Sequence, residues 1–571
     1  MAEIQITING QRVAAPAGST VLEAAGVAGI DIPTLCHHPA LNDWGACRMC
    51  LVEIERQRTL QPACTFPATD GMVVHTESEK VVAARKFVLE LLFSERNHYC
   101  MYCQMSGDCE LQDLAYRYGL TEWPYPRPTT PLPVDATRQY IVMDHNRCIL
   151  CRRCVRACAE LAANHTLAVR ERGIHSMIAA DLNVPLGESS CIECGTCLQV
   201  CPTGAIMDVK GAYRGRESEV ERTKSTCLGC SIGCGIEVVS RANHLVRIEG
   251  DWDAEVNAGL LCVVGRFEPL YDERKRVTEP LVRRRRNGAL EPTEWGEALD
   301  LVTKRLTDDG LAALITSRAT NETMSQFGKL FRSLGAETVA AVGSLAPAMG
   351  AEGKLVDLHE ADIIIVVGAD LKEDYQVAGA FVRRAVDRGA RLALVADTDN
   401  GLAPYAAWHV GFDEIGDVVG IAEQASQPVV VCAADLPAEA RAALAPLAGK
   451  ASFIGLSSGS NSRGAVGAGL ALSSGEDVNG ARVLYVLAED DALNIQRNGA
   501  EFMVAQASYV GPLTDMADVV LPAPIWAEQS GSVTNTEGRV QSVQAVLASP
   551  ETVWPTSKVL EALAGQLNLT L

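Results

Sequence analysis

The sequence predicts a multidomain α+β and α/β protein, and three observations support this prediction. At 571 residues, the chain is long enough for about four domains of roughly 150 residues each. Nineteen of its 20 cysteines lie between Cys36 and Cys262, whereas the rest of the chain contains only Cys432. Beyond residue 300, short β-branched runs alternate with alanine-rich stretches, which is typical of βαβ units around a mostly parallel sheet.

Composition and charge narrow the class of protein. Apolar residues make up 48% and charged residues 21% of the chain, a globular balance that argues against disorder, collagen and coiled coil. The net charge is −21, whereas proteins that bind nucleic acid usually carry an excess of basic residues. No nucleic acid is therefore expected among its partners.

The predicted location is the cytoplasm. The first eight residues contain neither a basic n-region nor an apolar h-region. No apolar run approaches the roughly 20 residues that span a bilayer, so no direct membrane span is expected. Dense cysteine without a secretory signal favours metal or redox chemistry over disulfides. A peripheral position on the cytoplasmic face of a membrane complex stays open.

Residues 1–80 predict a small β-grasp domain. An alternating apolar run at 4–8 precedes an Asn9-Gly10 turn, which indicates a β-hairpin, and Thr20 caps a short helix at 21–28. A cysteine-bearing loop follows, as in β-grasp ferredoxins. The first cysteine group has the spacing C-x10-C-x2-C-x13-C and consists of Cys36, Cys47, Cys50 and Cys64.

Four thiolates in this pattern can enclose a [2Fe–2S] cluster, although zinc also accepts four cysteines. The β-grasp context and the long x10 loop favour iron and sulfur. The spacing resembles the N-terminal ferredoxin domain of the complex I iron–sulfur subunit and of related hydrogenases and formate dehydrogenases. That resemblance implies one [2Fe–2S] cluster.

Residues 81–138 carry a second group with only three cysteines, Cys100, Cys103 and Cys109. A [4Fe–4S] cluster needs four ligands, and His98 is the nearest other candidate; the alternative is a surface or capping histidine. The segment resembles the His-ligated cluster domain of the same family, whose pattern is H-x3-C-x2-C-x5-C. The cysteine spacings match that pattern, but only one residue separates His98 from Cys100.

A helix and a linker flank this second group. The helix is predicted at 81–93, before the group. A stiff, extended linker is predicted after it, because five prolines fall within ten residues. The prolines are Pro124, Pro126, Pro128, Pro131 and Pro133.

Residues 139–215 contain two copies of the spacing C-x2-C-x2-C-x3-C, which indicates an internal duplication. In bacterial two-cluster ferredoxins, the fourth cysteine of each run binds the cluster of the other run. Resemblance to these ferredoxins implies two [4Fe–4S] clusters, whereas a zinc site has no use for eight thiolates in this pairing. The first expected ligand set is Cys148, Cys151, Cys154 and Cys201, and the second is Cys191, Cys194, Cys197 and Cys158.

Residues 220–275 carry the fourth spacing, C-x2-C-x3-C-x27-C. It resembles the N-terminal [4Fe–4S] site of the molybdopterin oxidoreductases, as does the following Gly265-Arg266-Phe267. These groups use every cysteine except Cys432, which lies in an apolar run and is expected to be a buried core thiol. The fourth expected ligand set is Cys227, Cys230, Cys234 and Cys262.

Residues 276–571 resemble a C-terminally shortened molybdopterin-oxidoreductase-like α/β region, including segments 461–464 and 528–539. In catalytic members a lysine commonly follows the fourth cluster cysteine by two residues, and Val264 stands there instead. The segment matching the catalytic cysteine or selenocysteine, at 343–347, contains Ser344 and no cysteine. The resemblance therefore implies a scaffold without molybdopterin and without catalytic residues of its own.

The same region is predicted to begin with a hairpin that turns at Asn287-Gly288, followed by a helix at 294–306. The basic run 283–286 beside this turn is expected to be exposed to solvent. No P-loop or well-placed dinucleotide fingerprint occurs in the chain, so neither FMN nor NAD is expected on it. Strands are predicted at 363–367, 392–395, 429–431, 483–487 and 519–521.

The whole chain resembles the G-type iron–sulfur subunit of NADH–quinone oxidoreductase (complex I). The resemblance implies an electron-transfer subunit of an NAD(P)H-linked oxidoreductase, with one [2Fe–2S] and four [4Fe–4S] clusters. The implied partners are an NAD(P)H-oxidising flavoprotein, a thioredoxin-like [2Fe–2S] subunit and a terminal redox subunit: a quinone module, a nickel–iron hydrogenase or a formate dehydrogenase. The alternatives are a molybdenum or tungsten formate dehydrogenase catalytic subunit, and a scaffold with vestigial clusters.

Overall fold

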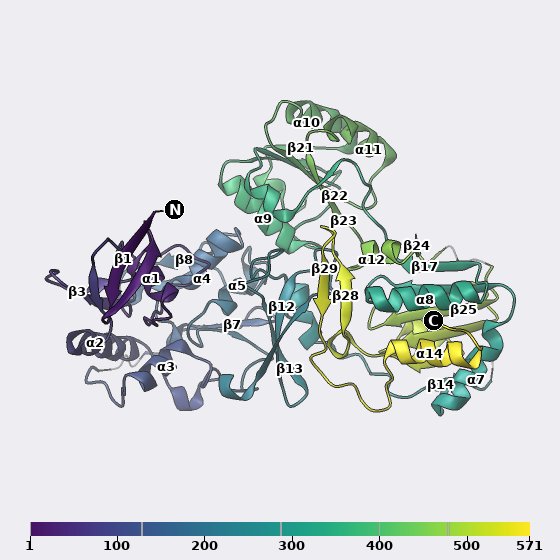
Figure 1. Cartoon of the computed structure of the whole chain (residues 1–571), viewed down its shortest axis with the longest axis horizontal. Helices are drawn as coiled ribbons and strands as arrows, with labels where there is room; N and C mark the ends of the chain where they lie inside the picture. Colours follow the sequence, from purple (N-terminus) through teal and green to yellow (C-terminus); the bar gives the residue numbers. More distant parts are fainter. Residues whose placement is uncertain (1, 127–129, 286–287, 399, 477, 479) are drawn as a thin grey trace. The chain divides into compact units, whose positions relative to one another are not determined.

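The computed structural model shown in Figure 1 describes residues 2–126, 130–285, 288–398, 400–476, 478 and 480–571. The chain divides into two units, Met1–Val220 and Glu221–Leu571. Pro128 of the predicted linker, and Arg286 and Asn287 of the predicted hairpin tip, lie outside the described residues. None of the 20 cysteines forms a disulfide bond.

The first unit begins with a five-stranded sheet of order β2-β1-β5-β3-β4 that packs on one helix. The predicted hairpin is confirmed: Asn9 and Gly10 have φ angles of 51° and 83°, as its two-residue turn requires. Thr20 caps the predicted helix in a capping box with Glu23. The elements are β1 (Glu3–Ile8), β2 (Gln11–Pro16), α1 (Val21–Val27), β3 (Leu51–Ile54), β4 (Gln61–Pro62) and β5 (Val73–His75).

A long helix and a short one follow. Ser78 caps the predicted long helix, which extends two residues beyond the predicted range at each end. Between α3 and the next strand, the described residues form neither helix nor strand, as expected for the proline-rich linker. The elements are α2 (Glu79–Glu95), η1 (Cys100–Tyr102) and α3 (Glu110–Arg117).

The duplicated cysteine runs fold alike. Leu150 and Arg152 in the first run, and Glu193 and Gly195 at the same positions of the second, all have positive φ angles between 51° and 70°. Each run then enters a four-residue helix. The elements are β6 (Val134–Asp135), β7 (Ile141–Asp144), η2 (His145–Arg147), α4 (Arg153–Arg156), η3 (Ala157–Leu161), β8 (Leu167–Arg170), η4 (Gly173–His175), β9 (Met177–Ala180), η5 (Leu186–Glu188), α5 (Thr196–Gln199), β10 (Ile206–Asp208) and η6 (Glu217–Glu219).

The second unit begins with a three-stranded antiparallel sheet that carries the first three cysteines of the fourth group between its first two strands. The hairpin β14–β15 forms beside the predicted turn. The elements are β11 (Glu221–Thr226), β12 (Gly235–Arg241), β13 (His244–Gly250), α6 (Val263–Arg266), η7 (Glu268–Leu270), β14 (Leu281–Arg283) and β15 (Leu290–Pro292).

The predicted βαβ region forms two sheets, where the sequence predicted one. The five predicted strands are present, as β19, β20, β22, β25 and β27, but strand patterns do not say which strands pair. An eight-stranded sheet has the order β15-β14-β27-β26-β25-β16-β17-β24 and is parallel from β27 to β24. A six-stranded sheet, β18-β23-β22-β19-β20-β21, is entirely parallel.

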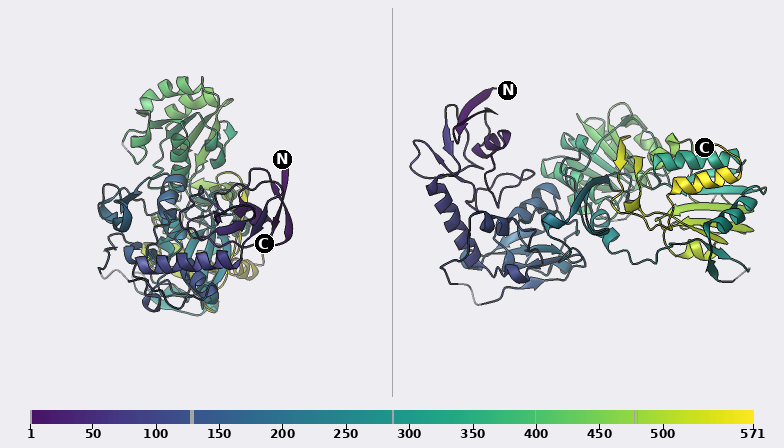
Figure 2. Two further views of the ribbon diagram at one scale, coloured as in Figure 1. Left: turned by 90° about the vertical axis from the view of Figure 1, so that its left-hand side faces the viewer. Right: turned by 60° about the horizontal axis from the view of Figure 1, so that its bottom comes forward.

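Both faces of the eight-stranded sheet are buried, because successive side chains of each strand point to opposite faces. Leu311, Ala313 and Ile315 pack with α7, α8 and α14, which lie on one face in Figures 1 and 2. Ala312 and Leu314 pack into the core on the other face. The elements are α7 (Trp295–Leu306), β16 (Leu311–Thr316), α8 (Asn321–Ser333), β17 (Thr338–Val342), α12 (Ser462–Gly467), β24 (Ala471–Ser473), β25 (Val483–Glu489), β26 (Phe502–Ala507), α13 (Pro512–Met516), β27 (Val519–Pro522), η12 (Trp526–Glu528) and α14 (Thr556–Gln566).

The six-stranded sheet packs on α10 and α11. Cys432 is fully buried in its strand β22, which confirms the prediction of a core thiol. A separate hairpin, β28 (Gly531–Thr534) with β29 (Val540–Val543), precedes α14. The other elements are β18 (Ala351–Glu352), η8 (Leu355–His359), β19 (Ile363–Val367), α9 (Gln376–Asp387), β20 (Arg391–Val395), η9 (Ala403–Tyr405), β21 (Trp408–Val410), η10 (Phe412–Glu414), α10 (Ile415–Ala422), β22 (Pro428–Ala433), α11 (Ala438–Leu444), η11 (Ala445–Leu447) and β23 (Ser452–Leu456).

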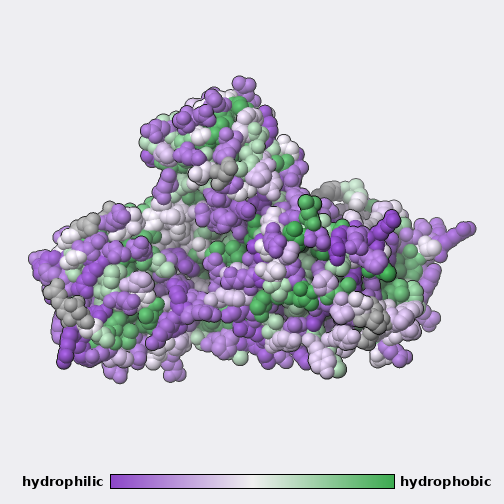
Figure 3. Space-filling view, turned by 180° about the vertical axis from the view of Figure 1, so that it is seen from behind, coloured by the Kyte–Doolittle hydropathy of each residue, from purple (hydrophilic) through white to green (hydrophobic). Residues whose placement is uncertain are grey.

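Hydrophilic residues cover most of the face shown in Figure 3, with smaller apolar patches between them. Among the helices of the described residues, none combines the length and the apolar composition needed to cross a bilayer.

Candidate iron–sulfur sites

The first cysteine group lies in the loop between α1 and β3 and just after β4, and its sulfur atoms form two close pairs. Cys50 Sγ and Cys64 Sγ are 3.4 Å apart. The backbone N–H of Cys47 donates to Cys36 Sγ over 3.4 Å, and the contact with the Cys47 side chain lowers the pKa of Cys36 to about 5. A [2Fe–2S] cluster fits this arrangement, because two irons need two thiolates each. Among the described residues, no three His, Cys, Asp or Glu side chains surround the position of a single metal ion.

The second group places its cysteines around a short turn. Cys100 lies in η1, Cys103 ends that turn, and Cys109 is the N-cap of α3. A Cβ atom at Gly204 would lie 3.2 Å from Cys103 Sγ, so a larger residue at 204 would crowd this sulfur.

His98 beside this group has the properties of a ligand. Its Nε2 atom is buried and has no hydrogen-bond partner in the part of the chain that the structure describes, and its ring packs edge-on against Phe93. Burial, together with the charges of Arg147 and Arg96, lowers the pKa of His98 to about 4. A neutral imidazole with an unpaired ring nitrogen is the form that binds a metal.

The duplicated runs surround two hollows. Cys148, Cys151, Cys154 and Cys201 line one of them, and Cys158, Cys191, Cys194 and Cys197 line the other. Each hollow therefore combines three cysteines of one run with the fourth of the other run, the same sets that the resemblance to two-cluster ferredoxins implies. In both runs the second residue after the first cysteine donates its N–H to that cysteine's sulfur, over 3.4 Å.

The fourth group lies between β11 and β12, with its last cysteine at the start of α6. Cys227, Cys230, Cys234 and Cys262 line one hollow, together with Val264. Gly229 and Gly265 donate backbone N–H groups to Cys227 Sγ and Cys262 Sγ over 3.4 and 3.3 Å. A Cβ atom at Gly265 would lie 3.1 Å from Cys227 Sγ, so this cradle needs a residue without a side chain.

Burial raises the pKa of Cys191 to about 12 and the pKa of Cys158 and Cys262 to about 11. Without a metal these three thiols are therefore protonated and neutral. Bound iron replaces these protons, because the thiolate is the ligand form. In the duplicated runs and in the fourth group, buried sulfur atoms that accept backbone N–H groups line a hollow, an arrangement that fits iron–sulfur clusters.

Segment 343–347, which by resemblance stands at the catalytic position of molybdopterin enzymes, lies beside Gly455 of β23. Ser344 donates its backbone N–H to Ser458 Oγ over 2.7 Å, and the two hydroxyl oxygens are 2.8 Å apart. Residues 345–350 line a cavity of about 430 Å³, beside the ion pair of Arg463 with Glu352.

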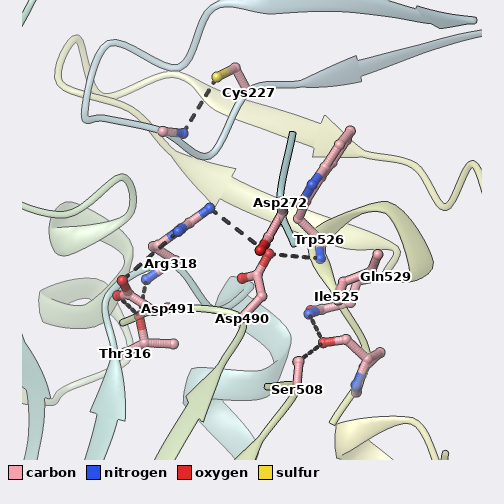
Figure 4. Close-up of polar contacts among 12 residues, drawn as sticks. Cys227, Asp272, Thr316, Arg318, Asp490, Asp491, Ser508, Ile525, Trp526 and Gln529 are labelled. Carbon is pink, nitrogen blue, oxygen red and sulfur yellow. Dashed lines mark hydrogen bonds and ion pairs between the residues drawn. The ribbon is translucent and has the colours of Figure 1, made fainter. Parts of the chain in front are cut away.

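A charged network that the sequence did not predict lies at the carboxyl ends of the adjacent strands β16 and β25 (Figure 4). The Arg318 guanidinium is 4.0 Å from Asp490 and 3.8 Å from Asp491. The Thr316 hydroxyl donates to the Asp491 carboxylate over 2.6 Å, and the backbone N–H of Trp526 donates to the Asp490 carboxylate over 3.2 Å. Burial raises the pKa of the nearby Cys227 thiol, whereas the Arg318 charge opposes that rise.

Glu489, directly before this pair of aspartates, gives the second unit a pH-dependent stability. Burial and the neighbouring Asp490 raise the pKa of Glu489 to about 7. The folded state therefore binds this proton more tightly than the unfolded state, so stability is lost as pH rises from about 4.5 to about 7. We expect a loss of about 2 to 3 kcal/mol, which Glu489→Gln removes.

Urea unfolding followed by circular dichroism at pH 5 and pH 8 measures this difference. The midpoint should fall with pH in the wild type and less in Glu489→Gln. The exposed Glu439→Gln is the control and should follow the wild type. Equal pH dependence in wild type and Glu489→Gln would contradict the assignment.

Five family models match the chain. Their descriptions are, in chain order, a 2Fe-2S iron-sulfur cluster binding domain (1–79), the NADH-ubiquinone oxidoreductase-G iron-sulfur binding region (85–123), the ferredoxin-like domain of NADH-quinone oxidoreductase subunit 3 (139–207), the molybdopterin oxidoreductase Fe4S4 domain (220–270) and molybdopterin oxidoreductase (276–427 and 447–566).

Several curated relatives match nearly the whole chain. The second G-type subunit of NADH-quinone oxidoreductase from Rhizobium meliloti is 30% identical over 95% of this chain and 77% of its own length. NADH-quinone oxidoreductase subunit 3 of Thermus thermophilus is 30% identical over 94% of this chain and 79% of its own length. Among solved structures, a chain of an NAD⁺-reducing [NiFe]-hydrogenase in the H₂-reduced state is 36% identical and covers 38% of this chain and 91% of its own length, with a TM-score of 0.36.

Proposed function

The chain belongs to the family of G-type NADH-quinone oxidoreductase subunits and is an iron–sulfur electron-transfer subunit of an oxidoreductase complex, and from this premise we propose its clusters and its partners. The proposed content is one [2Fe–2S] cluster and four [4Fe–4S] clusters. The observation that carries this proposal is that three hollows each collect a complete set of four cysteines. The close sulfur pair of the first group supports the [2Fe–2S] cluster, and the buried His98 Nε2, without a hydrogen-bond partner among the described residues, supports the remaining [4Fe–4S] cluster. The proposed ligands are the four cysteine sets described above, together with His98, Cys100, Cys103 and Cys109.

The proposed domain division follows the donor sets. It consists of a [2Fe–2S] ferredoxin-like domain (1–80), a His/Cys-ligated [4Fe–4S] domain with its linker (81–138), a two-cluster ferredoxin domain (139–215), a [4Fe–4S] domain of molybdopterin-oxidoreductase type (220–275) and an α/β scaffold without molybdopterin (276–571). The matched family segments begin and end near these boundaries and support the division.

When bound, such clusters accept and release single electrons. The chain's own residues hold and tune them. Backbone N–H groups donate to ligand sulfurs in the described loops, which stabilises negative charge on the sulfur. A neutral His98 in place of a thiolate removes one negative charge, which favours the reduced form of the second cluster.

His98 as a ligand is tested by substitution. We expect His98→Ala to remove or alter one [4Fe–4S] signal in electron paramagnetic resonance (EPR) spectra of the reduced protein and to spare the others. The exposed His175→Ala is the matched control and should leave all signals unchanged. An unchanged spectrum and iron content in His98→Ala would remove His98 from the ligand set.

The proposed partners are an NAD(P)H-oxidising flavoprotein, a thioredoxin-like [2Fe–2S] subunit and a terminal redox subunit. The last is a quinone module, a nickel–iron hydrogenase or a formate dehydrogenase. The relatives' names support this group, since they name subunits of NADH-quinone oxidoreductases. The proposed position is the cytoplasm or the cytoplasmic face of a membrane complex.

Anaerobic purification of the native complex, with mass spectrometry of the copurifying chains, tests the partners. Membrane and quinone-module subunits beside a flavoprotein would indicate a respiratory complex. A nickel–iron hydrogenase or formate dehydrogenase subunit beside the flavoprotein would indicate a complex without the quinone module. Purification of the chain without any flavoprotein would contradict the proposal.

The second candidate is a molybdenum or tungsten formate dehydrogenase catalytic subunit. It is favoured by the matches to molybdopterin oxidoreductase models over most of the second unit. Val264 beside the fourth group and Ser344 at the catalytic position argue against it. Stoichiometric molybdenum or tungsten in the purified protein would revive this candidate.

A further inference from the structure

Arg147 lies between two of the proposed cluster sites. It is the last residue of η2 and directly precedes Cys148. Its backbone carbonyl accepts a hydrogen bond from Thr203 over 2.9 Å, which fixes the main chain beside the Cys148 group. Its side chain, however, reaches the other group: the guanidinium Nη1 donates to Cys103 Sγ over 2.6 Å.

The guanidinium is held in place by Asp144, three residues earlier. Arg147 Nε is 2.9 Å from Asp144 Oδ2, and the two side chains are only 16% and 11% exposed. The other oxygen of Asp144 accepts from the backbone N–H and the side-chain amide of Asn146, over 2.9 and 2.8 Å. Because the carboxylate is fixed on both sides, the planar guanidinium has one orientation toward Cys103.

The guanidinium makes its direct contact with one member of this donor group, the Cys103 sulfur.

We propose that Arg147 is a positioning residue that raises the reduction potential of the cluster held by His98, Cys100, Cys103 and Cys109. This inference rests on the ligand set proposed above. Reduction adds one negative charge to a cluster, and a fixed cation with an N–H donor to a ligand sulfur stabilises the more negative state. Reduction potentials of such clusters depend on net charge and on hydrogen bonds to sulfur.

A second contact joins the same two sites without a charge. Cys109 Sγ lies 3.7 Å from the carbonyl oxygen of Pro202, which directly follows Cys201. The two sites thus abut through Cys103 with Arg147 and through Cys109 with Pro202. Of these two contacts, the first places a positive charge on a ligand sulfur, so Arg147 favours the electron on the His98 side of this junction.

Potentiometric EPR titration of the anaerobically purified full chain tests the role of Arg147. The signal to follow is the one that His98→Ala removes. In Arg147→Gln the midpoint potential of this signal should fall, so that the reduced fraction drops about tenfold, equivalent to about 59 mV for a one-electron couple. Arg147→Lys keeps the charge and should recover much of the shift. Arg138→Gln is the matched control, because Arg138 donates to backbone carbonyls near Cys191 and should leave this signal unshifted.

Arg147→Met serves as a second neutral variant if Arg147→Gln does not retain the cluster. A lowered potential in either neutral variant, with full iron content and recovery by Arg147→Lys, supports the proposal. An unshifted potential overturns it, and so does loss of the cluster from both neutral variants, since Arg147 would then act in assembly. If His98 is not a ligand, the result is different from either of these outcomes, because the wild type would then show no EPR signal that His98→Ala removes.

Discussion

Cys158→Ser should damage the cluster held mainly by Cys191, Cys194 and Cys197, although Cys158 belongs to the other run. The reason is geometric: Cys158 lines the same hollow as those three cysteines. A serine oxygen is a poorer iron ligand than a thiolate, so we expect loss or a large change of one [4Fe–4S] EPR signal and a lower iron content. The Cys148 cluster should keep its signal.

Two further variants make this result decisive. Cys201→Ser should damage the Cys148 cluster, because Cys201 lines that hollow. Cys432→Ala removes a thiol that is buried in β22, outside every group, and should leave all EPR signals unchanged. The opposite result would be damage to the Cys148 cluster in Cys158→Ser and damage to the Cys191 cluster in Cys201→Ser. Each run would then supply the fourth ligand of its own cluster, and the proposed exchange of fourth ligands between the runs would be wrong.

Removal of iron should unfold much of the first unit and spare the second. Between residues 141 and 208 the helices α4 and α5 have four residues each, and no strand is longer than four residues. Such short elements gain little from their own packing, so metal binding supplies much of the folding free energy. The second unit has three large apolar cores. Its folding therefore does not depend on iron outside its one cysteine group.

Limited proteolysis of the iron-loaded and iron-depleted protein measures this difference. We expect rapid cleavage of the depleted protein within residues 139–215 and a resistant fragment that begins near Glu221. Reconstitution with iron and sulfide should restore the original pattern. Equal protease resistance with and without iron would contradict the dependence.

Much of the architecture and of the donor sets could be predicted from sequence, because cysteine spacing is a local property. A C-x2-C-x2-C-x3-C run predicts its own loop and helix, and the repetition predicts a second copy. The hairpin at Asn9-Gly10 and the cap at Thr20 were likewise local signals, and the structure contains both.

What could not be predicted depends on contacts between distant segments. Strand patterns predicted strands at 483–487 and 363–367, and the structure contains both, but the patterns did not show that they belong to different sheets. The approach of Arg147 to Cys103 spans 44 residues, and the ion pairs of Arg318 span more than 170. No short motif carries such information. The orphaned Nε2 of His98 is also visible only once its burial is known.

The most direct test of the five-cluster account is metal and acid-labile sulfide analysis of the anaerobically purified chain, combined with EPR-monitored reduction. The account predicts about 18 iron atoms per chain, with one binuclear and four cubane signals. Zinc in place of iron, or iron without any EPR signal on reduction, would contradict it.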